Sequence, residues 1–230
     1  MKWAILSFPG TNCEEDTRYV LRESCGQDPA VIWHQEHDLR GADVVVLPGG
    51  FAHGDYLRCG AIARFSPIMD QVREHALRGK PVLGICNGMQ ILAEAGLLPG
   101  AMLRNESLEF RCGWVQLRVH APDTRFLRGI PAGTVLRMPI SHGEGRYHCT
   151  PEELAALLAA DQVLLRYCDA EGAYTPESNP NGSVGHIAGI RNAAGNVFGL
   201  MPHPERASEP LLGSADGLLI FRSLIEALHD

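Results

Sequence analysis

A short apolar segment runs into a cysteine flanked by glycines at Pro81-Val82-Leu83-Gly84-Ile85-Cys86-Asn87-Gly88, and a helical pattern over Met89 to Ala95 follows at once. A buried strand that turns directly into a helix is the geometry of a nucleophile elbow, here with cysteine where many hydrolases have serine. The glycines allow a sharp turn, and the N-terminus of the next helix favours a thiolate. The stretch predicts a reactive Cys86 at the end of a strand, although a buried cysteine in a glycine-rich turn would have the same five residues.

The region before this elbow repeats the same pattern. Val44 to Leu47 is apolar and β-branched, and it breaks at Pro48-Gly49-Gly50. Between the two apolar runs, Ile68, Val72 and Ala76 recur at helical spacing, with Gly79 as a C-terminal stop. Near-continuous apolar strands separated by helices are typical of a parallel sheet covered on both faces.

The second half of the chain indicates an antiparallel extension. Trp114 to His120 alternates in polarity, and Val135 to Ile140 follows as a further strand. We also expect a helix over 151–160 capped by Thr150, a loop over 174–182, a hairpin of 184–191 with 196–201, and a closing amphipathic helix over 218–228. The prediction is one α/β domain over residues 1–230, with an open, twisted, mostly parallel sheet, helices on both faces and an antiparallel extension.

Composition excludes several classes of function. The 230 residues are 45% hydrophobic and carry 20 basic against 27 acidic side chains, and this net charge of −7 disfavours nucleic acid and anionic membranes as partners. No apolar run approaches the roughly 18 residues of a membrane span, and Met1 to Phe8 is too short for a secretory signal. Seven irregularly spaced cysteines without a Cys-x-x-Cys pair indicate a reducing cytoplasm, no disulfide framework and no metal site.

A nucleophilic cysteine needs a base and a group that orients the base. The segment Met201-Pro202-His203-Pro204-Glu205 offers such a pair, because a residue before proline avoids the helical region. In an extended segment, residues two apart project to the same side, so His203 and Glu205 can lie together. A lone His-Pro-Glu would usually be a surface turn, but together with the elbow it predicts catalysis.

The Pro48-Gly49-Gly50 turn supplies a third element. Attack on an amide passes through an oxyanion, and backbone N–H groups at the carboxyl end of a strand are preorganised donors for it. A simple tight turn would have the same residues if it stood alone. No Gly-x-x-x-x-Gly-Lys loop is present, so nucleotide binding by this chain is not supported.

Taken together, Pro48-Gly49-Gly50, Gly84-x-Cys86-x-Gly88-x-Gln90 and His203-Pro204-Glu205 resemble the class I, or triad-type, glutamine amidotransferases, which implies a flavodoxin-like fold. The resemblance implies Cys86 as nucleophile, His203 as base and Glu205 as the orienting carboxylate. It also implies an oxyanion hole made by the backbone N–H groups of Gly50 and Asn87. The residues that it implies for glutamine binding are Gln90, Ser141, His142 and Gly143.

Longer stretches narrow the resemblance to one family within that class. The segments 50–60, 105–110 and 139–147 look like the glutaminase subunits of phosphoribosylformylglycinamidine synthases. This implies that ammonia passes to a separate, ATP-using synthetase subunit, with a small accessory subunit in the same complex. No cofactor is then expected on this chain, because ATP and magnesium belong to the synthetase.

Three other interpretations stay open. One is the glutaminase of another class I amidotransferase. A second is an elbow-type cysteine hydrolase or stress-response protein, many of which have histidine after the nucleophile where this chain has Asn87. A third is a non-catalytic regulatory subunit, which would require a broken triad.

Overall fold

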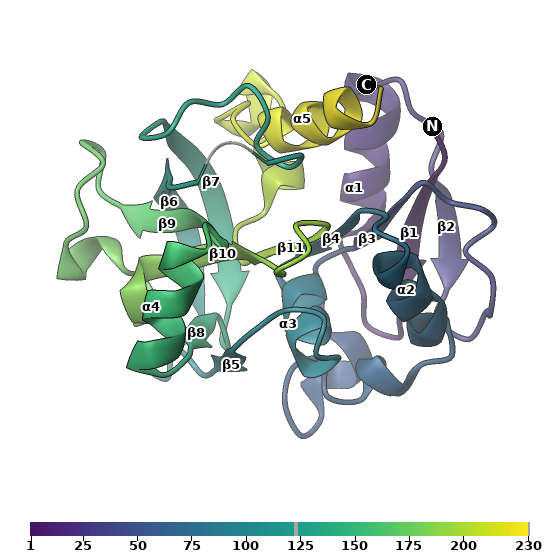
Figure 1. Cartoon of the computed structure of the whole chain (residues 1–230), viewed down its shortest axis with the longest axis horizontal. Coiled ribbons are helices and arrows are strands. Elements are labelled where there is room, and N and C mark those ends of the chain that lie inside the picture. The colour runs from purple at the N-terminus through teal and green to yellow at the C-terminus, as the bar shows by residue number, and fades with distance from the viewer. Residues whose placement is uncertain (122–123, 230) are drawn as a thin grey trace.

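Five parallel strands form one half of a nine-stranded sheet (Figure 1) in this computed structural model, which describes residues 1–121 and 124–229. Each of these strands is short and strongly apolar, as expected for strands with a helix layer on either side. In spatial order they are β2 (Ala30–Trp33), β1 (Trp3–Ser7), β3 (Val44–Leu47), β4 (Val82–Ile85) and β11 (Val197–Leu200). All four residues of β3 and of β4 are buried, so the predicted parallel sheet is confirmed.

The other half of the sheet is antiparallel, as the sequence predicts. Its strands continue from β11 in the order β10 (Ile187–Arg191), β9 (Val163–Cys168), β6 (Arg111–Val119) and β7 (Val135–His142). A separate pair is formed by β5 (Ala101–Leu103) and β8 (Arg146–His148). The expected strand over 184–191 begins only at Ile187, because positive φ angles at Gly185 (59°) and His186 (60°) turn the chain just before it.

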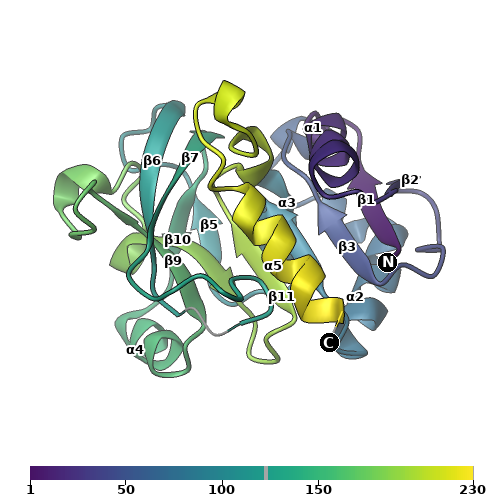
Figure 2. The same cartoon turned by 90° about the horizontal axis from the view of Figure 1, so that it is seen from above.

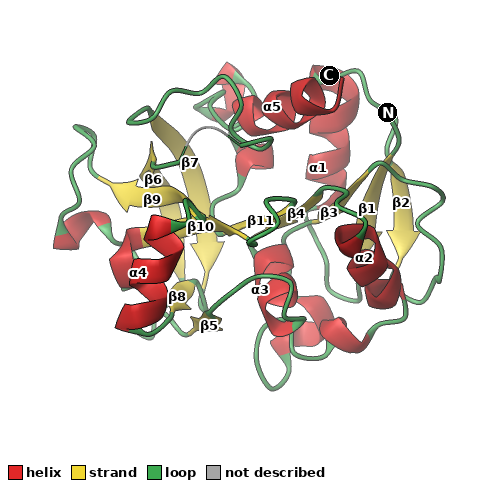
Figure 3. Cartoon of the chain, in the orientation of Figure 1, coloured by secondary structure: helices red, strands yellow, loops and turns green. Residues whose placement is uncertain are grey.

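Helices cover both faces of the sheet (Figures 1 and 2). Helices α1 (Glu14–Tyr19) and α5 (Leu218–His229) lie on one face, and α2 (Ile68–Leu77) and α3 (Asn87–Glu94) lie on the other. Helix α4 (Pro151–Ala159) packs beside the antiparallel half and begins with a capping box between Thr150 and Glu153. Residues 20–24 continue α1 as a π-helical turn. Figure 3 shows short helical turns in several connections, and the structure has them at 52–55, 63–65, 176–178, 184–186, 204–206 and 210–212.

The order of the parallel strands determines where functional loops meet. Strand β4 lies between β3 and β11, with Gly84 opposite both Leu47 and Gly199, and with Ile85 opposite Leu200. The carboxyl ends of these three strands therefore lie side by side at one edge. Those ends lead into Pro48-Gly49-Gly50, Cys86 and the segment 201–205, which brings the three predicted motifs together.

The structure contains neither disulfides nor membrane-spanning helices among the residues that it describes. All seven cysteines are free. Within the described residues, no helix has the length and apolar character needed to cross a membrane.

Candidate active site

Cys86 occupies the turn between β4 and α3. Its backbone has φ 49° and ψ −106°, a region that costs a non-glycine residue about 1–3 kcal/mol. The turn is held by a hydrogen bond from the Cys86 N–H to the carbonyl of Leu200 (2.8 Å) and by one from the Gln90 N–H to the Cys86 carbonyl (3.2 Å). The side chain is buried, and its thiol lies 3.7 Å from the carbonyl oxygen of Ser141. A strained residue between a strand and a helix is the elbow geometry that the sequence predicts.

His203 and Glu205 form a buried pair. The Nδ1 atom of His203 lies 2.5 Å from Oε1 of Glu205, and each residue is only 2% exposed. His203 is extended (φ −103°, ψ 92°), as expected before a proline, and its N–H donates to the carbonyl of Pro139 (2.8 Å). That bond joins the segment after β11 to β7, a strand of the antiparallel half of the sheet.

The charges around the imidazole favour its protonated form. Burial by itself lowers the pKa of His203, but the negative charge of Glu205 and then that of Cys86 act in the opposite direction. The pKa of His203 therefore lies well above its usual value. An imidazolium next to a cysteine sulfur is the arrangement that keeps a thiolate available as a nucleophile.

The Pro48-Gly49-Gly50 loop lies beside this group. Gly50 has φ 151°, and a Cβ there would lie 2.7 Å from the Cα of Thr11, so only glycine fits. The Phe51 N–H donates to the carbonyl of Gly10 (2.8 Å), whereas none of the backbone hydrogen bonds in this loop uses the N–H of Gly50. The first N–H groups of α3, including that of Asn87, also have no intrahelical partner. Their role as oxyanion donors stays a prediction.

The structure places the four residues predicted to bind glutamine around the same edge. Ser141 presents its carbonyl to Cys86, and the carbonyl of Gly143 accepts from the backbone N–H of Asn105 (2.9 Å). His142 is 3% exposed, and burial followed by the charge of His203 lowers its pKa to about 4, so it is neutral at pH 7.

Gln90 makes hydrogen bonds within the protein. It is buried, with its Nε2 donating to the carbonyl of Glu144 (2.7 Å) and its Oε1 accepting from Asn87 Nδ2 (2.9 Å). Its amide thus already bonds within the protein, and its contact with glutamine stays a prediction.

Two buried residues near the site were not assigned a role from sequence. Asn105 receives hydrogen bonds at Oδ1 from Gly145 N–H (2.9 Å) and His142 Nδ1 (3.1 Å), and its Nδ2 donates to the carbonyl of His142 (2.9 Å). It therefore holds the loop that follows β7. Cys13 lies beside His203. Its loop follows β1, which pairs with β3, and its backbone N–H donates a hydrogen bond to the carbonyl of Gly49 at the end of β3.

Cys13, His203 and Glu205 are also the residues that could hold a metal ion, since one ligand atom of each lies within 4.8 Å of the others. Two features oppose a cation there. The His203–Glu205 pair is already joined by a hydrogen bond, and a guanidinium nitrogen of Arg206 lies 3.1 Å from the Cys13 sulfur. The arrangement therefore fits cysteine–histidine chemistry better than metal binding.

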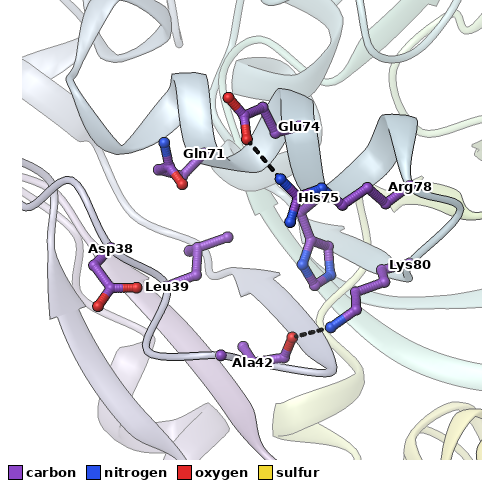
Figure 4. A pocket seen from close by; sticks show the side chains of 9 residues that line it. Asp38, Leu39, Ala42, Gln71, Glu74, His75, Arg78 and Lys80 are labelled. Atoms are coloured by element: carbon purple, nitrogen blue, oxygen red, sulfur yellow. Dashed lines mark hydrogen bonds and ion pairs between the residues drawn. The ribbon is translucent and has the colours of Figure 1, made fainter.

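A cavity of about 170 Å³ lies elsewhere in the molecule (Figure 4). It is formed between the loop before β3 and the end of α2, where Lys80 donates to the carbonyl of Ala42 (3.0 Å) and Arg78 pairs with Glu74 (3.0 Å). Because these segments lead into the amino ends of β3 and β4, the cavity is at the opposite edge of the sheet from Cys86.

Comparisons with known proteins agree with this site. The chain matches the family described as the CobB/CobQ-like glutamine amidotransferase domain over residues 1–215. Fold, site and match together define the class as glutamine amidotransferase, an enzyme class with glutaminase activity. The match favours this class over an elbow-type cysteine hydrolase.

Individual relatives identify one family within this class. Phosphoribosylformylglycinamidine synthase subunit PurQ of Thermosynechococcus vestitus is 57% identical, with 97% of this chain and 95% of the relative covered. The subunit of the same name from Methanosarcina barkeri is 54% identical, with 100% and 99% covered. A chain in the structure of PurLQS from Thermotoga maritima has a TM-score of 0.86 at 41% identity, with 99% and 98% covered. The chain belongs to the family of these PurQ subunits.

Proposed function

We propose that this chain is the glutaminase subunit of a phosphoribosylformylglycinamidine synthase and that Cys86, His203 and Glu205 perform its chemistry. The observation that supports these roles most strongly is the buried His203–Glu205 pair, at 2.5 Å, placed next to a cysteine in an elbow. The names of the relatives support the substrate and the pathway, de novo purine synthesis.

In the proposed first step, the Cys86 thiolate attacks the side-chain amide carbon of glutamine. The N–H groups of Gly50 and Asn87 stabilise the oxyanion. The intermediate collapses as the C–N bond breaks, and protonated His203 gives its proton to the leaving ammonia. This leaves a glutamyl thioester on Cys86 and a neutral imidazole.

In the second step, His203 accepts a proton from a water molecule that attacks the thioester. A second oxyanion forms and collapses, which releases glutamate and restores the Cys86–His203 pair. Glu205 holds the imidazole through Nδ1 and stabilises its protonated form in both steps.

Ammonia has to reach a consumer before it is lost to solvent. We assign that role to a separate synthetase subunit that uses ATP and magnesium to convert formylglycinamide ribonucleotide to the amidine, with a small accessory subunit in the assembly. The name PurLQS of the similar structure supports such an assembly. We expect the complex in the cytoplasm, which the seven free cysteines support.

Replacement of the nucleophile tests this proposal. In the assembled synthase, Cys86→Ala should abolish amidine formation from glutamine and leave amidine formation from added ammonia intact. Cys112→Ala, at an exposed cysteine, is the matched control and should keep both activities. If glutamine supported the Cys86→Ala complex at the wild-type rate, the assignment of the nucleophile would be wrong.

A further inference from the structure

The side chain of Asn87 connects two segments of the site. Asn87 is 1% exposed, and its Oδ1 accepts a hydrogen bond from the backbone N–H of Ala52 (3.1 Å). Its Nδ2 donates to Gln90 Oε1 (2.9 Å) and, at a longer distance of 3.4 Å, to Asp55 Oδ1. One carboxamide therefore links the start of α3 to the loop that contains Gly50.

Neighbouring groups fix the orientation of this carboxamide. Gln90 Nε2 donates to the carbonyl oxygen of Glu144 (2.7 Å), so Gln90 Oε1 faces Asn87. At the other end, the Ala52 N–H can only donate, so it requires the oxygen of Asn87. A backbone donor at one end and a backbone acceptor at the other thus fix both amides, and we call this pair of side chains, Asn87 and Gln90, the amide bridge.

The other backbone hydrogen bonds close to Gly50 lead away from α3, and the next link from this connection to α3 is the pairing of Arg58 with Glu94 at the C-terminal end of the helix. The Phe51 N–H and the His53 N–H donate to the carbonyls of Gly10 and Pro9, and the carbonyl of Gly49 accepts from the loop after β1. These bonds position the loop against β1 but do not set its distance from the nucleophile. The two oxyanion donors lie on different segments, with Gly50 on the loop and the Asn87 N–H on α3.

We propose that the Asn87 side chain is a positioning residue that fixes the spacing between the Gly50 N–H and the Asn87 N–H, with Gln90 holding it in place. The inference rests on the proposed roles of Cys86 and of these two donors. Ala52 is two residues beyond Gly50, so losing its bond to Asn87 frees the loop to shift relative to α3. Oxyanion stabilisation depends on donors placed within a few tenths of an ångström of the oxygen, and a misplaced donor costs much of its effect.

Two reactions of the same cysteine separate this role from a general structural one. Glutamine hydrolysis needs both the thiolate and the oxyanion hole, whereas alkylation of Cys86 by iodoacetamide needs the thiolate alone. In the assembled synthase, Asn87→Ala should lower kcat for glutamine hydrolysis by about 10²-fold. The rate constant for Cys86 alkylation and its pH profile should stay within about twofold of wild type. Gln71→Ala, which removes an amide that lines the cavity at the opposite edge of the sheet from Cys86, is the control and should change neither.

Each other outcome overturns the inference. An unchanged kcat would show that the amide bridge does not set the spacing. A parallel fall in kcat and alkylation, or a shifted pH profile, would mean that Asn87 acts on the thiolate or on folding, and a thermal unfolding curve would identify the latter. Failure of the proposed function itself would be seen separately, as glutamine hydrolysis that survives Cys86→Ala.

Discussion

Gly88 is the position where the packing around the nucleophile allows least change. A Cβ at Gly88 would lie 1.9 Å from the carbonyl oxygen of Leu47 and 2.7 Å from its carbonyl carbon. Real Cβ atoms essentially never approach closer than 3.0 Å, and both contacted atoms belong to the backbone at the end of β3. In Gly88→Ala, the start of α3 must therefore move away from β3 by about 1.1 Å.

Two opposing effects decide the stability of this variant. Alanine within a helix raises the free energy of unfolding by about 1 kcal/mol relative to glycine, whereas overpacking lowers it by about 1–3 kcal/mol. The net loss of about 0–2 kcal/mol corresponds to a decrease in Tm of up to about 8 °C for a chain of this size. Activity should suffer more, because a displacement of about 1 Å between reacting groups can cost about 10²-fold in rate.

Steady-state glutamine hydrolysis and thermal unfolding measure both effects. Gly113→Ala, at a glycine whose Cβ would meet nothing within 4 Å, is the control and should keep the wild-type rate. If Gly88→Ala hydrolysed glutamine at the wild-type rate with a raised Tm, helix propensity would outweigh the clash. The reasoning about the close approach of α3 to β3 would then be refuted.

Three further predictions concern the histidines and their neighbours. Glu205→Gln removes the charge that keeps His203 protonated, and steady-state glutamine hydrolysis should fall about 10³–10⁴-fold, whereas a rate near wild type would contradict its role. Because the pKa of His142 falls from 6.5 to about 4 on folding, the unfolded chain binds a proton first as the pH drops. The free energy of unfolding from denaturant titrations should fall by up to about 3 kcal/mol between pH 6.5 and pH 4. This fall should be smaller in His142→Gln and as large as in wild type in the control His148→Gln. Gly49→Ala places a Cβ 2.7 Å from Cε1 of His203, and the displaced imidazole should lower kcat for glutamine hydrolysis about 10²-fold. An unchanged kcat would show that this clash does not displace the imidazole.

The parts of the fold that could be predicted from sequence depend on local patterns. The apolar runs of β3 and β4 and the Thr150 cap each involve a few adjacent residues, and the structure has them where expected. The pairing of His203 with Glu205 is present as predicted, but only His203 is extended, as expected before a proline. The expectation of an extended segment through Glu205 was wrong, because residues 204–206 form a short 3-10 turn that begins with Pro204 and brings Glu205 back to the imidazole.

Contacts between distant segments could not be predicted in the same way. Cys13 reaches His203 because β1 pairs with β3, and nothing in the residues around Cys13 distinguishes it from a core cysteine. Gly217 approaches the carbonyl of Pro204 so closely that a Cβ would lie 2.2 Å from it, yet in sequence it is an ordinary turn glycine before α5. The bonds of Asn87 with Ala52 likewise need the packing of α3 against the end of β3.

The most direct test of the central claim is an acid quench of the assembled synthase during turnover of ¹⁴C-labelled glutamine, followed by peptide mapping. We predict label attached as a glutamyl thioester to the peptide that contains Cys86, and none in Cys86→Ala. Label on a different cysteine, or turnover at the wild-type rate in Cys86→Ala, would contradict the claim that this residue is the nucleophile.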